Sequence, residues 1–115
     1  MSPFCAKVVS YAKNSPGTNL QTLTPAALKA KYTGYKSATK TLLSIAPRSI
    51  KPDLEKVFTF DNARFAALQK ASWSFSKVPL ATLKSWAVKG PALRPSSDKV
   101  ISYFDKTCGL KYPRP

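Results

Sequence analysis

The residue types that could perform catalysis are sparse in this 115-residue sequence, which contains no His, two Cys and five acidic residues. His is the commonest general base and a frequent metal ligand. Asp53 and Glu55 lie two positions apart on an expected helix, so their carboxylates cannot face each other as a catalytic pair. Two thiolates without a His cannot complete a tetrahedral zinc site. We therefore expect a protein without enzymatic activity, cofactor or metal.

Asp61 is the acidic residue whose position is unusual. It falls inside an expected apolar helical arc, between Phe58 and Phe65. One interpretation is a buried acid with a raised pKa and a functional role. The other is a core acid that pairs with a neighbouring Lys or Arg, or that caps a break in the helix. We favour the second interpretation, because buried charges are usually paired.

Cys5 and Cys108 stand near opposite ends of the chain, at the start of the first expected helix and the end of the last. A disulfide requires Cα atoms about 4.4–6.8 Å apart. An up-down-up-down bundle brings these two helix ends to the same pole. We therefore predict a Cys5–Cys108 disulfide, which implies an oxidising compartment and a secreted or cell-surface protein. The alternative is a pair of reduced cysteines that act as small buried hydrophobic residues.

The elements that must position the two cysteines are helices. Residues 3–13 are expected to form the first one, which ends at a turn-forming run over residues 14–17. Thr24 caps a second helix that begins at Pro25 and ends at about Ala46. Its apolar seam alternates steps of four and three residues, as in helix bundles: Leu28, Tyr32, Tyr35, Thr39, Leu42 and Ala46.

A third helix is expected to begin near Pro52 and to end before Pro79, with one apolar face formed by Leu54, Val57, Phe58, Phe65, Leu68 and Phe75. The pairs Gly90-Pro91 and Arg94-Pro95 predict a turn-rich linker. Ser96 or Ser97 then caps a last helix with Asp98 in its first turn, and Gly109 closes it in the left-handed conformation. The apolar arc of this helix comprises Val100, Ile101, Phe104 and Cys108.

The expected fold class is all-α: an up-down-up-down four-helix bundle of residues 1–110, followed by a flexible tail over residues 111–115. Residues 79–89 are ambiguous, because their apolar residues have helical spacing. A fifth full helix would place Cys108 at the pole opposite Cys5. The predicted disulfide therefore implies that residues 79–89 form a short crossing segment.

The charge of the sequence is strongly unbalanced, with 19 Lys and Arg against five Asp and Glu and a formal net charge of +14. Such an excess attracts polyanions. Arg, the usual reader of guanine edges, occurs at only four positions. A surface dominated by Lys suits diffuse attraction to nucleic acid, anionic lipid or an anionic wall polymer better than it suits sequence-specific recognition. The alternative is a solubilising surface without a specific partner.

Lys29, Lys36 and Lys40 fall within about 40° of one another on the second expected helix. They are candidates for an anion-binding ridge, and the equally weighted alternative is a solvated helix face. Trp73 falls outside the apolar arc of the third helix. It is either an aromatic contact for a partner or, as we favour, a residue that packs on the 79–89 segment together with Trp86.

Two runs of the sequence, LLSIAPRSIKPDL at residues 42–54 and YFDKTCGL at residues 103–110, resemble small exported helical proteins of actinobacteria that have no assigned function. The resemblance includes a Cys near the N-terminus and a terminal Tyr…Thr-Cys-Gly motif, and it covers most of the chain except residues 76–95. It implies secretion, helices and a terminal disulfide, and it carries no catalytic residue. This chain departs from that group in its positive charge, since we expect the group to be neutral or acidic.

Together these features predict a secreted helical module that binds anionic envelope components, either a polymer or a lipid surface, by electrostatic attraction. A basic nucleic-acid-binding protein is the first alternative, and the predicted disulfide and the shortage of Arg oppose it. A secreted membrane-active protein of antimicrobial or toxin type is the second. No stretch is long and apolar enough to predict a membrane span.

Overall fold

The computed structural model describes residues 2–14 and 22–110, which form five α-helices, a short 3-10 helix and no β-strand. The expected all-helical class is confirmed. The elements in chain order are α1 (Pro3–Asn14), α2 (Pro25–Ile45), α3 (Lys51–Lys70), η2 (Phe75–Lys77), α4 (Leu80–Ala92) and α5 (Arg94–Thr107). The predicted turn after Asn14 and the predicted tail over residues 111–115 lie outside the described residues.

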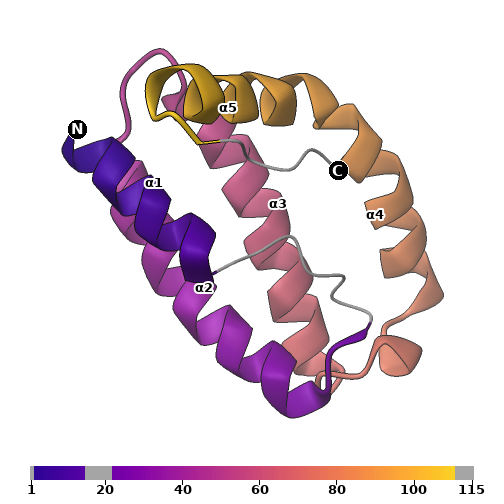
Figure 1. Ribbon diagram of the computed structural model, residues 1–115. Coiled ribbons are helices and arrows are strands. Elements are labelled where there is room, and N and C mark those ends of the chain that lie inside the picture. The colour runs from indigo at the N-terminus through magenta and orange to yellow at the C-terminus, as the bar shows by residue number, and fades with distance from the viewer. Residues whose placement is uncertain (1, 15–21, 111–115) are drawn as a thin grey trace.

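The first three helices run alternately down and up as antiparallel neighbours, and α4 returns along the outer side of the molecule (Figure 1). The last helix, α5, crosses the top of this arrangement and ends beside the start of α1. The most extensive helix contacts are those of α3 with α5 and with α2. The molecule measures 42 × 27 × 23 Å along its principal axes.

The predicted disulfide is confirmed: Cys5 and Cys108 are bonded, with their Cα atoms 5.1 Å apart. The four-helix arrangement is not confirmed, because residues 80–89 of the segment expected to cross the bundle belong to α4, a 13-residue helix that follows Pro79. The element that crosses the bundle is α5 instead. Since α5 runs across the pole and not along the bundle axis (Figure 1), five helices still bring both cysteines to one end.

The start of α2 follows the sequence prediction. Thr24 caps the helix by accepting a hydrogen bond from the Ala27 backbone N–H at 3.2 Å on its Oγ1 atom. The predicted seam is buried at Leu28, Tyr35, Thr39 and Leu42. This seam faces α3, whose own face is buried at Leu54, Phe58, Phe65 and Leu68.

The third helix ends at Lys70, earlier than the limit predicted before Pro79. The chain leaves the helix through two consecutive left-handed residues, Ser72 at φ 53° and Trp73 at φ 63°. Left-handed backbone is uncommon outside Gly, Asn and Asp. No residue of those types marks this position, so the sequence offered no signal for the break.

The predicted linker between the last two helices is absent, because α4 and α5 are joined only by Leu93, which itself has helical backbone angles. Pro95 lies in the first turn of α5, where a missing N–H is tolerated. The start of α5 is therefore Arg94, and neither Ser96 nor Ser97 caps it with a side chain. Asp98 consequently lies beyond the first turn. Gly109 has φ +69°, as the predicted left-handed closing residue requires.

Two groups of buried side chains hold the fold together. The larger group lies between α1, α2, α3 and α5 and includes Phe4, Phe58, Phe104 and the disulfide. The smaller group joins the start of α2 to the end of α3 and the chain that follows, and its buried members are Leu28, Leu68, Ala71 and Val78. We call the end of the molecule near the disulfide the disulfide pole. The end that contains the smaller group is the far pole.

Candidate anion-binding surface

Acidic residues are confined to one part of the fold. All five lie in two segments, residues 53–61 and 98–105. The first segment belongs to the N-terminal half of α3 and the second to α5, and these two elements pack on each other. The helices α1, α2 and α4 contain no acidic residue, although all three contain lysines. The positive excess of the protein is therefore concentrated away from the contact between α3 and α5.

Asp53 connects the two acidic segments. Its carboxylate accepts a hydrogen bond from Ser96 Oγ at 2.9 Å and lies 3.3 Å from Lys99 Nζ. The hydrogen bond from Ser96, assisted by Lys99, lowers the pKa of Asp53. The residue also lies in the first turn of α3, where the helix dipole favours a negative charge. Part of the positive charge at the disulfide pole is thus neutralised within the protein.

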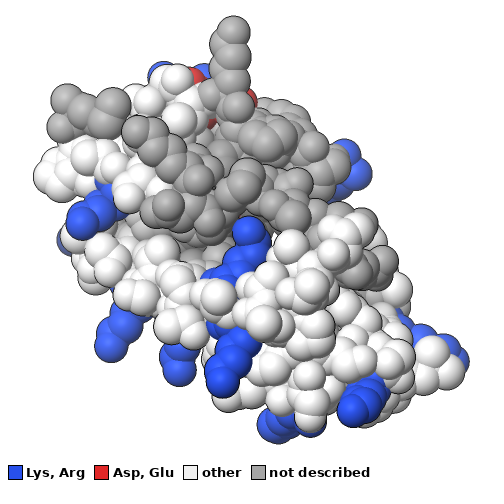
Figure 2. All heavy atoms as spheres, turned by 60° about the horizontal axis from the view of Figure 1, so that its bottom comes forward, with Lys and Arg blue, Asp and Glu red and all other residues white. Residues whose placement is uncertain are grey.

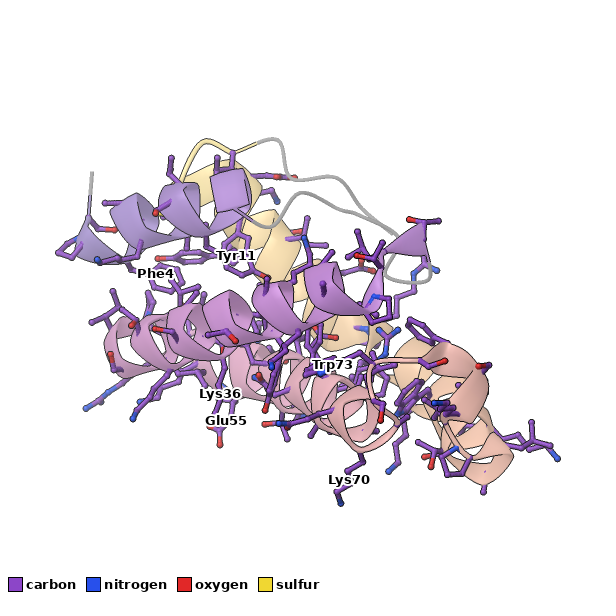
Figure 3. All side chains as sticks on the ribbon, turned by 90° about the horizontal axis from the view of Figure 1, so that it is seen from below. Phe4, Tyr11, Lys36, Glu55, Lys70 and Trp73 are labelled. Atoms are coloured by element: carbon purple, nitrogen blue, oxygen red, sulfur yellow. A yellow bond between two sulfur atoms is a disulfide. The ribbon has the colours of Figure 1, made fainter. Side chains whose placement is uncertain are left out.

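The lysine ridge of Lys29, Lys36 and Lys40 lies on α2, and all three residues are exposed. Its length along the helix axis is about 16 Å. Lys36 Nζ lies 5.9 Å from the centroid of the Tyr32 ring, which is a cation–π distance. In Figure 3, α1 is at the top and Lys36 lies on the opposite side of α2. The ridge is therefore open to a partner that approaches from outside.

Further lysines extend the positive surface over the far pole. Lys70 at the end of α3, Lys77 in η2 and Lys84 in α4 are all exposed. Figure 2 looks toward this end of the molecule, and Lys and Arg atoms are spread across the visible face. Asp and Glu atoms are visible only at its upper edge. The far pole and the lysine ridge together form a surface on which an anion meets little internal competition.

Asp61 belongs to a buried polar contact between α2 and α3. The Tyr35 hydroxyl donates a hydrogen bond to Asp61 Oδ2 at 2.7 Å. Burial raises the pKa of Asp61, while the Tyr35 hydrogen bond and the charge of Arg64 act in the opposite direction. Burial also raises the pKa of Tyr35, so the phenol remains a proton donor. The partner of the acid is thus a tyrosine that the sequence assigned only to the apolar seam.

The two tryptophans have the packing role favoured from the sequence. Trp73 and Trp86 both pack around the smaller buried group, together with Leu83 of α4. Trp73 also contacts the larger group, and its ring centroid lies 5.6 Å from that of Tyr32. Trp73 therefore bridges the two groups of buried side chains.

A groove lies between α3 and α4, and sequence reasoning missed it. It consists of two adjoining hollows of about 700 and 380 Å³ that share Phe60, Ala63 and Lys89. Trp86 lines the smaller hollow and Lys56 the larger one. The groove was missed because residues 79–89 were expected to cross the bundle. The available signal was the helical spacing of the apolar residues in this segment.

Within the described residues, no group of three or more His, Cys, Asp or Glu side chains is arranged to hold a metal ion. Among the helices of the same part of the chain, none is both long enough and apolar enough to cross a membrane. In comparisons with known proteins, the chain matches no protein-family model, no curated sequence and no solved structure.

Proposed function

We propose that this protein is a secreted, non-enzymatic helical module that binds an anionic polymer or lipid surface of a cell envelope by electrostatic attraction. The observation that supports this function is the separation of charge along the fold. All five acidic residues belong to α3 or α5, whereas the lysine ridge and the far pole carry exposed lysines without acidic neighbours in sequence.

The disulfide supports the secreted part of the proposal, because such bonds persist in oxidising compartments outside the cytosol. It joins residues 103 positions apart and so ties α5 to α1. A covalently closed fold suits attachment to a surface, since the helices that carry the lysines need not be ordered on binding.

Binding should weaken steeply with salt, because the Debye length falls from about 10 Å at 0.1 M to about 3 Å at 1 M. We would measure sedimentation of the protein with vesicles containing anionic lipid and with an insoluble anionic wall polymer, from 50 mM to 1 M NaCl. Retention that does not change over this range would contradict the proposal. Tight binding to duplex DNA at physiological salt, without retention on either envelope material, would favour the nucleic-acid alternative.

The site is tested by a triple variant, Lys29→Gln/Lys36→Gln/Lys40→Gln. A Lys near an anionic surface contributes about 1 kcal/mol, so we expect a loss of affinity of roughly 100-fold. The matched control is Arg48→Gln/Lys51→Gln/Lys106→Gln, which removes the same charge from exposed positions nearer the acidic segments. An equal loss in both variants would show that net charge alone matters and that the lysine ridge is not the site.

A further inference from the structure

We infer that the groove between α3 and α4 binds one single-chain amphiphile with an anionic head group, such as a long-chain fatty carboxylate. This inference goes beyond the electrostatic function above and does not depend on it. In the groove the apolar chain of the ligand makes the main contact, and charge selects the head group.

The helix α4 is only partly packed: Leu83 and Trp86 lie against the smaller buried group, whereas Leu80 and Val88, which do not line the groove, are largely exposed. None of its residues is buried, and Leu80 and Val88 are 65% and 72% exposed. By contrast, α2, α3 and α5 each bury four residues. On the side that faces α3, Thr82, Ser85 and Trp86 of α4 border the groove. Each of the two hollows, of about 700 and 380 Å³, has the size of ordinary ligand sites, which is about 300–1,000 Å³.

Small side chains give the groove a shape that suits an extended alkyl chain. Ala63 and Ala67 line it from α3, and Ala81 lines it from α4. Two aromatic rings, Phe60 and Trp86, complete the apolar lining. Alkyl chains bind by removing such surface from water, without directional contacts. A linear alkyl chain therefore fits the apolar part of this lining, and Thr82 and Ser85 of α4 supply hydroxyl groups beside it.

Arg64 lies between the aromatic rings that α3 and α4 contribute to the groove. Its guanidinium carbon lies 5.7 Å from the Phe60 ring centroid and 5.4 Å from that of Trp86. Its Nε atom is buried without a hydrogen-bond partner among the described residues. The guanidinium thus contacts rings of both helices through cation–π attraction. It acts as a spacer between α3 and α4.

The charges at the larger hollow select the head group. Lys56 and Lys89 line it from α3 and α4, and both are exposed. Glu55 is the only acid of the lining. Lysine ammonium groups bind carboxylates and phosphates by charge-assisted hydrogen bonds. A ligand whose anionic head group lies between Lys56 and Lys89 in the larger hollow can place its alkyl chain in the smaller hollow, beside Trp86.

The test uses dodecanoate, dodecyl maltoside and dodecyltrimethylammonium, each below its critical micelle concentration. Titration calorimetry gives the affinity and stoichiometry. Emission of Trp86 is followed in a Trp73→Phe background, which leaves Trp86 as the single tryptophan. We expect one dodecanoate per protein, weaker binding of the maltoside and the weakest binding of the cation. Shortening the carboxylate should reduce affinity about two- to fourfold per methylene.

Two pairs of variants locate the site. Ala63→Phe fills the groove and should weaken dodecanoate binding at least tenfold. Its control, Ala87→Phe, lies at an exposed position of α4 that does not line the groove and should bind as the wild type does. Lys56→Gln/Lys89→Gln should weaken dodecanoate severalfold and leave the maltoside unchanged. The charge-matched control Lys70→Gln/Lys84→Gln should change neither ligand. Circular dichroism checks that each variant is folded.

Several outcomes would overturn the inference. One is the absence of dodecanoate binding below its micelle concentration. Another is an equal effect of Ala63→Phe and Ala87→Phe. Equal affinity for dodecanoate and dodecyltrimethylammonium would show that Lys56 and Lys89 do not select an anionic head group. Binding in the groove should also persist at 1 M NaCl, where electrostatic attachment to a surface is lost, so the two proposals can fail separately.

Discussion

The two ends of this molecule are built in different ways. The disulfide pole combines a covalent link with the larger buried group, and its acid Asp53 is paired inside the protein. The far pole has a smaller buried group, two consecutive left-handed residues and exposed lysines. It also carries the start of α4, which buries none of its side chains.

This difference between the two poles suggests a division of roles, in which the disulfide pole stabilises the fold and the far pole binds a partner. Surfaces that bind partners are commonly drawn from the less stable parts of a protein, since contacts used for folding are not available to a partner. Here the unburied apolar surface of α4 and the unpaired positive excess both lie outside the disulfide pole. This division of roles predicts that substitutions at the disulfide pole lower the free energy of unfolding more than substitutions at the far pole.

The largest effect is expected from removing the disulfide. The variant Cys5→Ala/Cys108→Ala frees a loop of nearly the whole chain and should lower the free energy of unfolding by about 2–5 kcal/mol. Urea denaturation measures this loss. Hydrogen exchange should show the greatest loss of protection in α1 and α5. Uniform loss across all helices, including the start of α4, would contradict the division into two poles.

A pair of leucines compares the packing of the two regions directly. Leu54 is fully buried in the larger group, and Leu54→Ala should cost about 2–5 kcal/mol. Leu83 is only partly buried and packs against the smaller group. Leu83→Ala should therefore lower the free energy of unfolding by about 1 kcal/mol. Thermal or urea denaturation measures both values. Equal costs would mean that α4 is packed as firmly as the disulfide pole.

The buried contact of Tyr35 with Asp61 should respond differently to two substitutions. Asp61→Ala leaves a buried hydroxyl without its acceptor and should cost about 1–3 kcal/mol. Asp61→Asn keeps an acceptor and removes the buried charge. Since burial raises the pKa of Asp61 in the folded state, the contribution of Asp61 to the free energy of unfolding falls as pH rises above about 3.9 through that pKa. Asp61→Asn should lack this fall and equal or exceed the wild type at pH 7. Urea denaturation from pH 3 to pH 8 measures it.

Sequence reasoning worked best where a local signal marks the backbone. Thr24 and Pro25 mark the start of α2, and Gly109 marks the end of α5. It placed the cysteines at one pole through an up-down-up-down four-helix arrangement that the structure does not confirm, because α5 and not residues 79–89 crosses the bundle. The break after Lys70 rests on left-handed backbone at Ser72 and Trp73, which their residue types do not favour. Pro95 was read as a linker residue, although a first turn tolerates it.

The candidate site could be predicted only in part. The residues of the lysine ridge followed from helical spacing, because exposure on one face is a local property of α2. The pairing of Asp53 with Ser96 joins positions 43 residues apart and depends on α5 crossing α3. The groove likewise depends on where α4 lies. Features of this kind are set by tertiary packing, which helical periodicity does not encode.

The turn at the far pole offers a stabilising substitution. Ser72 is exposed and has φ 53°, which an L-residue adopts at a cost and Gly adopts freely. We expect Ser72→Gly to raise the free energy of unfolding, by no more than about 1 kcal/mol, because Gly also has more entropy to lose on folding. Thermal denaturation measures the change, with Ser49→Gly at another exposed position as the control. A loss of stability equal to that of the control would show that the turn stores no strain.

The smallest effect is expected at Asp53, and its sign distinguishes it from Asp61. The hydrogen bond from Ser96 lowers the pKa of Asp53 in the folded state. Its contribution to stability is therefore present above about pH 3.9 and is lost as pH falls through the folded pKa. Asp53→Asn should flatten the acid side of the stability profile, whereas Asp61→Asn should flatten the opposite slope above about pH 3.9. Urea denaturation between pH 2 and pH 5 measures the Asp53 effect. If Asp53→Asn and Asp61→Asn changed the pH dependence of stability in the same direction, the opposite environments that the structure gives Asp53 and Asp61 would be contradicted.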